Sequence, residues 1–419
     1  MTNRLARVCL CTATLLVADI FFNFGAAAFG PTSAEIGTVD RVEIATKIYS
    51  AVRLYFAHGQ GIDIDQAYRQ YLNQIVSTPG RKAFDLATLK FVGTLKNGHT
   101  RFVDDWLNEH YGQPLPFWVE NLGGQWVVTS SEQEDLPRGS VVSELDGVAI
   151  DKVMNEQMQY VSASNERIAR SHVMNMPFLF PDTFVVTLEN GTKVRVERGA
   201  SRQEVGQGIN ASEGRWLVKD QMAYIKIPSF GDPNYEQTAL ALESEYRSAS
   251  SLVIDVRGNG GGVTPLQLIG ALMNQPWRTW NELTPRHIAL FEAQGRAEAM
   301  LLIPSRTVQP APQAYSGRLV FVVDRYCGSA CEDLVMPFKD NGRATIIGET
   351  TQGSTGQPYQ FQPYEGMTFM LGTVRCNFPD GSQFESVGIT PTIAIEASAE
   401  DIVENRDPVL AKAEEVAKE

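Results

Sequence analysis

The chain has 419 residues, which at about 150 residues per domain indicates two or three domains. Hydrophobic residues make up 43% and charged residues 20%, a composition that excludes disorder, collagen and coiled coil as the dominant state. The 36 basic and 49 acidic side chains give a net charge of -13, so binding to nucleic acid or an anionic membrane through bulk charge is disfavoured.

The first 28 residues have the pattern of a secretory signal peptide. Arg4 and Arg7 precede an uncharged apolar run over 8–18, Asp19 interrupts it, and a small-residue stretch ends at Ala28. The run is short for a membrane span, and Asp19 would lie inside the hydrocarbon. We therefore expect a cleaved leader and a mature protein in the periplasm or outside the cell, with an uncleaved anchor as the alternative.

Cleavage after Ala28 leaves three cysteines: Cys327, Cys331 and Cys376. Three is odd, so at least one thiol is free or pairs with another chain. An oxidising compartment allows one disulfide, but the sequence does not choose the pair. No CxxC pair occurs, which argues against a structural zinc site. We expect neither a metal nor another cofactor.

Residues 29–115 are expected to form an N-terminal helical domain. Apolar side chains at 68, 71, 72, 75 and 76 share one face of a helix, with Asp65 as its N-cap. A second helix runs from about Phe84 to Asn97, and Gly98 fits the left-handed position that closes it. His99 is therefore expected in a loop just beyond a helix end.

Residues 116–200 change to a β-rich pattern. Two strand-like runs flank Gly123-Gly124, and residues 183–196 have the pattern of a hairpin around Asn190-Gly191. The segment "LPRGSVVSELDGVAI" at 136–150 resembles a PDZ domain as found inside secreted processing peptidases. An unrelated β-rich spacer is the alternative.

Residues 201–400 alternate strands and helices, and residues 401–419 are expected to form a C-terminal helix. Apolar strands are predicted over 223–227, 252–256 and 319–323, followed by a helix that starts at Ala330. This alternation predicts an α/β layer structure.

The segment Cys327-Gly328-Ser329-Ala330-Cys331-Glu332 lies between such a strand and such a helix. Unpaired N–H groups and the dipole at a helix start would stabilise a developing oxyanion beside Ser329. The alternative is an ordinary N-cap serine. The segment is not the G-x-S-x-G elbow, because residue 331 is Cys.

A second motif places four glycines after a buried strand, in Val256-Arg257-Gly258-Asn259-Gly260-Gly261-Gly262. Glycines let a backbone approach a ligand and turn its N–H groups outward. The phosphate-loop interpretation fails, because no G-K-[ST] follows. An oxyanion hole or a peptide-docking edge remains, with a flexible connection as the alternative.

Two further motifs are ordinary when taken alone: Asn97-Gly98-His99-Thr100, and Glu385 within Phe384–Pro391. Together with the serine and glycine motifs, they resemble the secreted serine peptidases that include the C-terminal processing peptidases and the tricorn core. The resemblance covers about residues 90–395. It implies an α/β core of the crotonase-like (ClpP/crotonase) type, with an N-terminal helical segment and an inserted PDZ-like domain.

The resemblance distinguishes two branches of this family. The C-terminal processing branch uses a Ser-Lys dyad, but Ser354 stands where that Lys would be, and a Ser is no general base near neutral pH. The tricorn-like branch takes its base from a motif that His99-Thr100 matches, and Glu385 occupies the place of the acid partner. That branch has Ser before the His, whereas this chain has Gly98.

The predicted function is a serine endopeptidase acting on polypeptides, through C-terminal or extended segments. Its triad would be Ser329, His99 and Glu385, and N–H groups of Ala330 and of Gly261 or Gly262 would hold the oxyanion. An inactive peptide-binding protein and an esterase or acyl-transfer enzyme are the alternatives. The hydrolytic prediction depends on whether folding brings His99 to Ser329.

Overall fold

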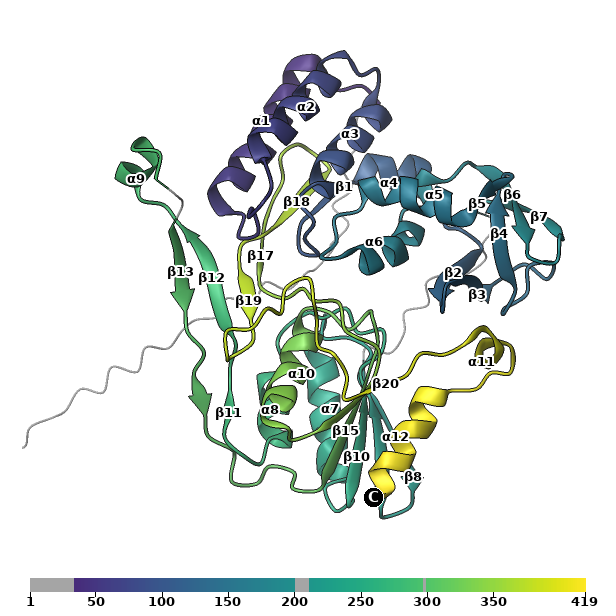
Figure 1. Cartoon of the computed structure of the whole chain (residues 1–419), viewed down its shortest axis with the longest axis vertical. Helices are drawn as coiled ribbons and strands as arrows, with labels where there is room; N and C mark the ends of the chain where they lie inside the picture. The colour runs from purple at the N-terminus through teal and green to yellow at the C-terminus, as the bar shows by residue number, and fades with distance from the viewer. Residues whose placement is uncertain (1–33, 200–210, 297–298) are drawn as a thin grey trace, which may run out of the picture.

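The structure is a computed structural model that describes residues 34–199, 211–296 and 299–419 (Figure 1). The signal peptide expected over 1–28 lies outside these residues. No helix within the described ranges combines the length and the apolar character that a membrane crossing requires.

A six-stranded sheet forms the centre of the α/β unit, in the order β20-β16-β15-β10-β9-β8. Strand β8 is antiparallel to its neighbour, and the other neighbouring pairs are parallel. The strands expected over 223–227, 252–256 and 319–323 are confirmed, each shifted by about one residue. The strand bounds are β8 Glu213–Val218, β9 Met222–Lys226, β10 Ser251–Asp255, β15 Arg318–Val323, β16 Thr345–Gly348 and β20 Ile393–Ala394.

Helices cover both faces of this sheet, which explains why its central strands are apolar without alternation. Leu252 and Ile254 pack into the cluster under one layer of helices, and Val253 points to the opposite side, toward the C-terminal helix. The first layer contains α7 Pro233–Glu245, α8 Leu266–Leu272 and α10 Ala330–Asn341; the other face carries α12 Pro408–Lys418.

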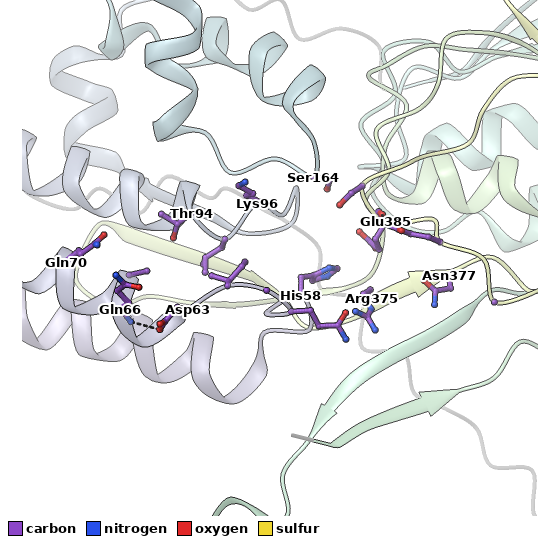
Figure 2. Close-up of a pocket in the computed structure, with 18 residues that line it drawn as sticks. His58, Asp63, Gln66, Gln70, Thr94, Lys96, Ser164, Arg375, Asn377 and Glu385 are labelled. Atoms are coloured by element: carbon purple, nitrogen blue, oxygen red, sulfur yellow. Dashed lines mark hydrogen bonds between the residues drawn. The ribbon is translucent and has the colours of Figure 1, made fainter. Parts of the chain in front are cut away.

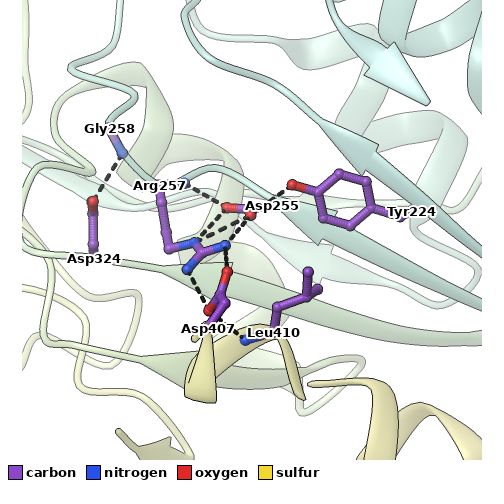
Figure 3. A network of polar contacts seen from close by, with 7 residues as sticks. All are labelled: Tyr224, Asp255, Arg257, Gly258, Asp324, Asp407 and Leu410. Atoms are coloured by element: carbon purple, nitrogen blue, oxygen red, sulfur yellow. Dashed lines mark hydrogen bonds and ion pairs between the residues drawn. The ribbon is translucent and has the colours of Figure 1, made fainter. Parts of the chain in front are cut away.

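A partly buried ionic network fastens α12 to the sheet (Figure 3). Arg257 Nη2 donates to Asp255 Oδ2 over 2.6 Å and to Asp407 Oδ2 over 2.8 Å. Tyr224 donates its hydroxyl to the same Asp255 oxygen over 2.8 Å. Asp407 is also the N-cap of α12 and accepts from Leu410 N. The predicted C-terminal helix is thus tied to the end of strand β10.

A second sheet is antiparallel, with the order β2-β3-β4-β6-β7 and its own hydrophobic core. The hairpin expected over 183–196 is confirmed by the pairing of β6 with β7. Its elements are β2 Phe117–Leu122, β3 Gln125–Ser131, β4 Val141–Leu145, β5 Val148–Ala149, α5 Ile150–Gln157, α6 Glu166–His172, β6 Thr183–Leu188 and β7 Lys193–Glu197, with short 3-10 turns at Met158–Tyr160, Val173–Asn175 and Pro177–Leu179.

The N-terminal helices pack on a small sheet that is shared with a distant part of the chain. Strand β1 pairs with β18, which pairs in turn with β17. Met367, Phe369 and Leu371 of β18 lie in the same hydrophobic cluster as the helices. The bounds are α1 Thr38–Tyr55, α2 Ile64–Ser77, α3 Arg81–Gly93, β1 Arg101–Asp104, α4 Asp105–Tyr111, β17 Pro358–Phe361 and β18 Met367–Gly372.

Two predicted helix ends are wrong. Asp63, not Asp65, caps α2 by accepting from Gln66 N, while Asp65 accepts the hydroxyl of Tyr49. Helix α3 ends at Gly93, because the next three N–H groups bond to carbonyls three residues back rather than four. The left-handed residue beyond it is Lys96 (φ 48°), not Gly98.

An arm projects beside the α/β unit and carries the remaining strands (Figure 1). Its strands pair in the orders β13-β12-β19 and β11-β14. The bounds are β11 Trp277–Arg278, β12 Asn281–Arg286, α9 Ala289–Ala293, β13 Ala299–Ile303, β14 Thr307–Val308 and β19 Arg375–Asn377, and a short α11 spans Ala399–Val403.

A buried ion pair joins the start of α3 to the end of β1. Arg81 Nε donates to Asp104 Oδ2 over 2.7 Å, with side chains 1% and 0% exposed. We expect Arg81→Met to lower the free energy of unfolding by about 3–5 kcal/mol, because it leaves the Asp104 carboxylate buried and unpaired. Urea denaturation measures this change.

The control is the same substitution at an exposed pair, Lys412 with Glu415, which lie 2.7 Å apart. Lys412→Met should cost less than about 1 kcal/mol, because water screens that pair. Equal losses in the two variants would contradict the assignment of Arg81 as a clamp.

Candidate active site

The nucleophile candidate Ser329 lies in the turn between β15 and α10. The N–H of Gly328 donates to Asn259 O over 3.1 Å, and that of Ser329 donates to Ser354 O over 2.9 Å. Ser329 has φ 54° and ψ -125°, a conformation that residues other than glycine rarely adopt. Such a residue costs about 1–3 kcal/mol, so the surrounding contacts must impose it.

The structure selects the cysteine pair that the sequence left open. Cys327 and Cys331 form a disulfide that brackets Ser329, and Cys376 is a buried free thiol. Both bridged cysteines are fully buried in the hydrophobic core between the central sheet and the helices α7, α8 and α10.

The glycine segment packs directly against this turn. A Cβ atom at Gly261 would lie 2.6 Å from Ser329 Cβ and 2.9 Å from Ala330 N, so only glycine fits there. Gly258 N donates to Asp324 Oδ2 over 3.0 Å, which ties the segment to the end of β15 (Figure 3).

The candidate oxyanion donors differ in availability. Gly261 N already donates to Asn259 Oδ1 over 2.9 Å. Among the described residues, neither Gly262 N nor Ala330 N makes a hydrogen bond. Of the two glycines considered from the sequence, Gly262 therefore has the free N–H.

His99 lies in a turn that its neighbours hold rigidly. Asn97 Oδ1 accepts from His99 N over 3.1 Å and from the Thr100 hydroxyl over 2.9 Å. Gly98 N donates to Ser164 Oγ over 3.1 Å, and the Thr100 hydroxyl accepts from Gly372 N in β18. These contacts fix the direction in which the imidazole points.

Folding brings His99 to Ser329, although the two are 230 residues apart in sequence. His99 Nε2 lies 3.1 Å from Ser329 Oγ, within hydrogen-bonding distance. Its Nδ1 lies 2.8 Å from Ser354 Oγ. The imidazole thus connects two hydroxyl groups.

The environment of His99 favours the neutral imidazole. Burial is the main cause that lowers its pKa to about 4, and the positive charges of His58 and Arg101 act in the same direction. At pH 7 the ring is therefore neutral and able to accept a proton.

Glu385 does not touch His99. Its Oε1 accepts from Thr355 N over 3.4 Å and from Cys376 N over 3.3 Å, and no hydrogen bond in the described residues reaches its Oε2. The side chain is 4% exposed, and this burial raises its pKa well above the ordinary glutamate value. Direct contact with the imidazole belongs to Ser354 instead.

Ser354 is the site residue whose role the sequence did not reveal. A Cβ atom at Gly98 would lie 2.8 Å from Ser354 Oγ and 3.0 Å from its Cβ, so Gly98 leaves room for this serine. The sequence signal that could have revealed this role is a pair of departures from the family pattern: Gly98 in place of the Ser before the histidine, and Ser354 in place of the Lys.

Glu332, in the first turn of α10, holds the loop that carries Ser354. Its fully buried carboxylate accepts from Gly353 N over 2.7 Å and from Ser354 N over 3.0 Å. Burial raises the pKa of Glu332 to about 8, although these donors oppose the shift. The helix that begins after Ser329 thus also positions the hydroxyl beside His99.

A polar cavity of about 850 Å³ adjoins the site (Figure 2). Its lining includes Ser164 and Glu385 together with the basic side chains of His58, Lys96 and Arg375. Within the described residues, no group of three or more His, Cys, Asp or Glu side chains is arranged to hold a metal ion.

Comparisons with known proteins show what the α/β unit is similar to. Residues 221–395 match the model of Peptidase family S41. The chain is 28% identical to the carboxy-terminal processing protease CtpB of Bacillus subtilis over 49% of this chain and 40% of that protein. It is 26% identical to the tricorn protease of Thermoplasma acidophilum over 45% of this chain and 16% of that protein. The chain thus covers less than half the length of these curated relatives.

Solved structures share the fold over most of the chain. Mature CPAF complexed with lactacystin has a TM-score of 0.72 at 16% identity, covering 91% of this chain and 98% of that chain. The photosystem II D1 C-terminal processing protease has a TM-score of 0.52 at 18% identity, covering 85% and 93%. These likenesses concern the fold and confirm the expected mixed α/β architecture.

We expect the His99 imidazole to titrate near pH 4, because burial disfavours the charged ring. NMR of the histidine rings as a function of pH measures this, and a His99→Asn variant identifies the resonance among five histidines. A midpoint near the ordinary value of about 6.5 would contradict the buried, neutral state.

Proposed function

We propose that this chain, whose residues 221–395 match the model of Peptidase family S41, is a serine endopeptidase with Ser329 as nucleophile and His99 as general base. The observation that carries the proposal is the 3.1 Å distance between His99 Nε2 and Ser329 Oγ. A serine hydroxyl is a weak nucleophile at its own pKa and requires a base within this reach.

In the proposed reaction, Nε2 of His99 takes the proton of Ser329 Oγ as the oxygen attacks the scissile carbonyl. The imidazolium then gives that proton to the leaving amine, and water hydrolyses the acyl-enzyme by the same steps. The free N–H groups of Ala330 and Gly262 hold the oxyanion. Each such donor contributes about 2.7–4 kcal/mol to transition-state stabilisation.

Ser354 orients the base in this proposal. When Nε2 accepts from Ser329, the ring proton is on Nδ1 and is donated to Ser354 Oγ, 2.8 Å away. The Ser354 hydroxyl then has its own proton to donate. Ser354 is therefore a positioning residue that fixes the tautomer, a role that the sequence analysis had assigned to Glu385 as the acid partner.

Glu385 completes the set through Ser354 rather than by touching the ring. Its Oε2 is a buried acceptor without a partner among the described residues, and its Oε1 is bonded to Thr355, the next residue after Ser354. A direct contact or a bridging water would let the Ser354 hydroxyl donate a hydrogen bond to this oxygen. In its ionised form, which burial disfavours, the carboxylate would stabilise the imidazolium as the acid does in a triad.

We further propose that residues 201–400 form a crotonase-like core and that residues 116–200 form an inserted PDZ-like domain. The six-stranded antiparallel sheet with its own core supports the second assignment. Strand β2 lies at the edge of that sheet, where an extended or C-terminal polypeptide segment can add as a further strand. Asn165 and Arg167 of this domain bond to the carbonyls of Gln352 and Thr351, near Ser354.

The proposed location is the periplasm or the cell exterior, after removal of residues 1–28. The Cys327–Cys331 disulfide supports an oxidising compartment, because such bonds are rare in the cytosol.

We expect Ser329→Ala and His99→Ala each to lower kcat on an unfolded protein substrate by about 10⁴–10⁶-fold, because nucleophile and base act as a unit. The measurements are the hydrolysis rate and labelling of Ser329 by a fluorophosphonate. The matched controls are Ser382→Ala and His110→Ala, which change exposed side chains outside the site and should retain the wild-type rate.

Two outcomes would replace the proposal. A wild-type protein that binds peptides but is neither labelled nor active would be an inactive peptide-binding protein. Rapid turnover of esters without cleavage of peptides would indicate an esterase or acyl-transfer enzyme on the same core.

We expect Ser354→Gly to lower kcat by about 10- to 100-fold, because Nδ1 loses a buried partner worth about 1–3 kcal/mol. Gly98→Ser alone should also lower kcat, since its Cβ would crowd Ser354. Combining the two changes moves the hydroxyl to the other side of the same space and should recover activity above Ser354→Gly alone. Losses that simply add would contradict the positioning role.

A further inference from the structure

The disulfide of this protein encloses its candidate nucleophile. Cys327 and Cys331 are four residues apart, with Ser329 midway between them, and their Cα atoms are 5.5 Å apart. Cys327 follows strand β15, and Cys331 lies in the first turn of α10. The covalent ring therefore contains the nucleophile and the proposed oxyanion donor Ala330 N.

The backbone in this ring has an unfavourable conformation at Ser329. Ser329 has φ 54°, a value that an L-residue retains only where its surroundings impose it. Gly328 N and Ser329 N are anchored to Asn259 O and Ser354 O. Ala330 N has no such anchor among the described residues, as an oxyanion donor requires.

Hydrogen bonds restrain the peptide between Ser329 and Ala330 through its carbonyl only, since Ser329 O accepts from Glu332 N over 2.7 Å and from Asp333 N over 3.0 Å. The disulfide adds a covalent restraint to these bonds. It fixes both ends of the turn, so the peptide between Ser329 and Ala330 cannot rotate without moving the start of α10. Both cysteines are fully buried in the hydrophobic core, with 0% of their surface exposed to solvent. The close packing around them keeps the disulfide in place.

We propose that the Cys327–Cys331 disulfide is a positioning element of the nucleophile turn, and that peptide hydrolysis requires this bond to be formed. The inference rests on the proposed function of Ser329. The cysteines touch neither substrate nor reacting atoms; they act through the direction of Ser329 Oγ and Ala330 N. A dithiol reductant would break the S–S bond, leave two thiols and become a disulfide itself, a balanced two-electron exchange.

The test compares wild type with Cys327→Ala, Cys331→Ala and the double variant. We expect kcat to fall by about 10- to 100-fold in all three, with KM changed by less than about threefold, because a misplaced nucleophile affects the reaction more than binding. The double variant should be no worse than either single variant, since one change already removes the bond. The rate of fluorophosphonate labelling should fall in parallel.

A second arm needs no variant. Wild-type protein is treated with dithiothreitol, the fraction of reduced pair is measured by thiol alkylation and mass spectrometry, and activity is followed. Activity should fall with that fraction and return on reoxidation, whereas the residual activity of the double variant should not respond to the reductant. This arm decides the matter if the variants fail to fold.

Two results would overturn the inference. One is a folded double variant with a lower Tm but wild-type kcat, which would make the bond a structural staple only. The other is full activity while the pair is reduced. If instead the oxidised wild-type protein is neither labelled nor active, the proposed function itself is wrong, and this inference falls with it.

Discussion

The pairing of strand β1 with strand β18 is the constraint on which the site depends. His99 comes two residues before β1, and β18 lies between the segments that carry Ser354 and Glu385. The register sets Arg101 opposite Met370, and Thr100 accepts from Gly372 N at the end of β18. These bonds hold an early segment against the α/β unit, so the imidazole meets the hydroxyl of a residue 230 positions later.

Burial of the base has two opposing consequences. It keeps His99 neutral at pH 7, ready to accept a proton, but it also disfavours the imidazolium that forms during reaction. The Ser354 hydroxyl beside Nδ1 and the buried carboxylate of Glu385 behind it offset the second effect in the proposed mechanism. A chain of polar groups in a low-dielectric environment is effective only if every member is satisfied.

The nucleophile turn shows how a strained conformation is maintained. Hydrogen bonds from Gly328 and Ser329, close contact with Gly261, and a disulfide around the serine all restrain one short segment. Glu332 links this turn to Ser354, because its carboxylate accepts a hydrogen bond from the backbone N–H of Ser354. The proposed nucleophile, the proposed oxyanion donors and the partner of His99 are therefore parts of one packed unit around the start of α10.

The sequence by itself determined the α/β order of strands, the serine at a strand–helix junction, and the glycine segment, because these follow from local periodicity and turn chemistry. It also singled out His99 as the candidate base. Only the tertiary structure decided that Ser354 contacts Nδ1, that Glu385 stands one step behind it, and that Cys327 pairs with Cys331. Those choices depend on distances between segments far apart in the chain, which local patterns do not encode. The same limit applies to the pKa of His99, which is lowered to about 4. Its main cause, burial, is a property of the folded chain, and the contributions of His58 and Arg101 act through space.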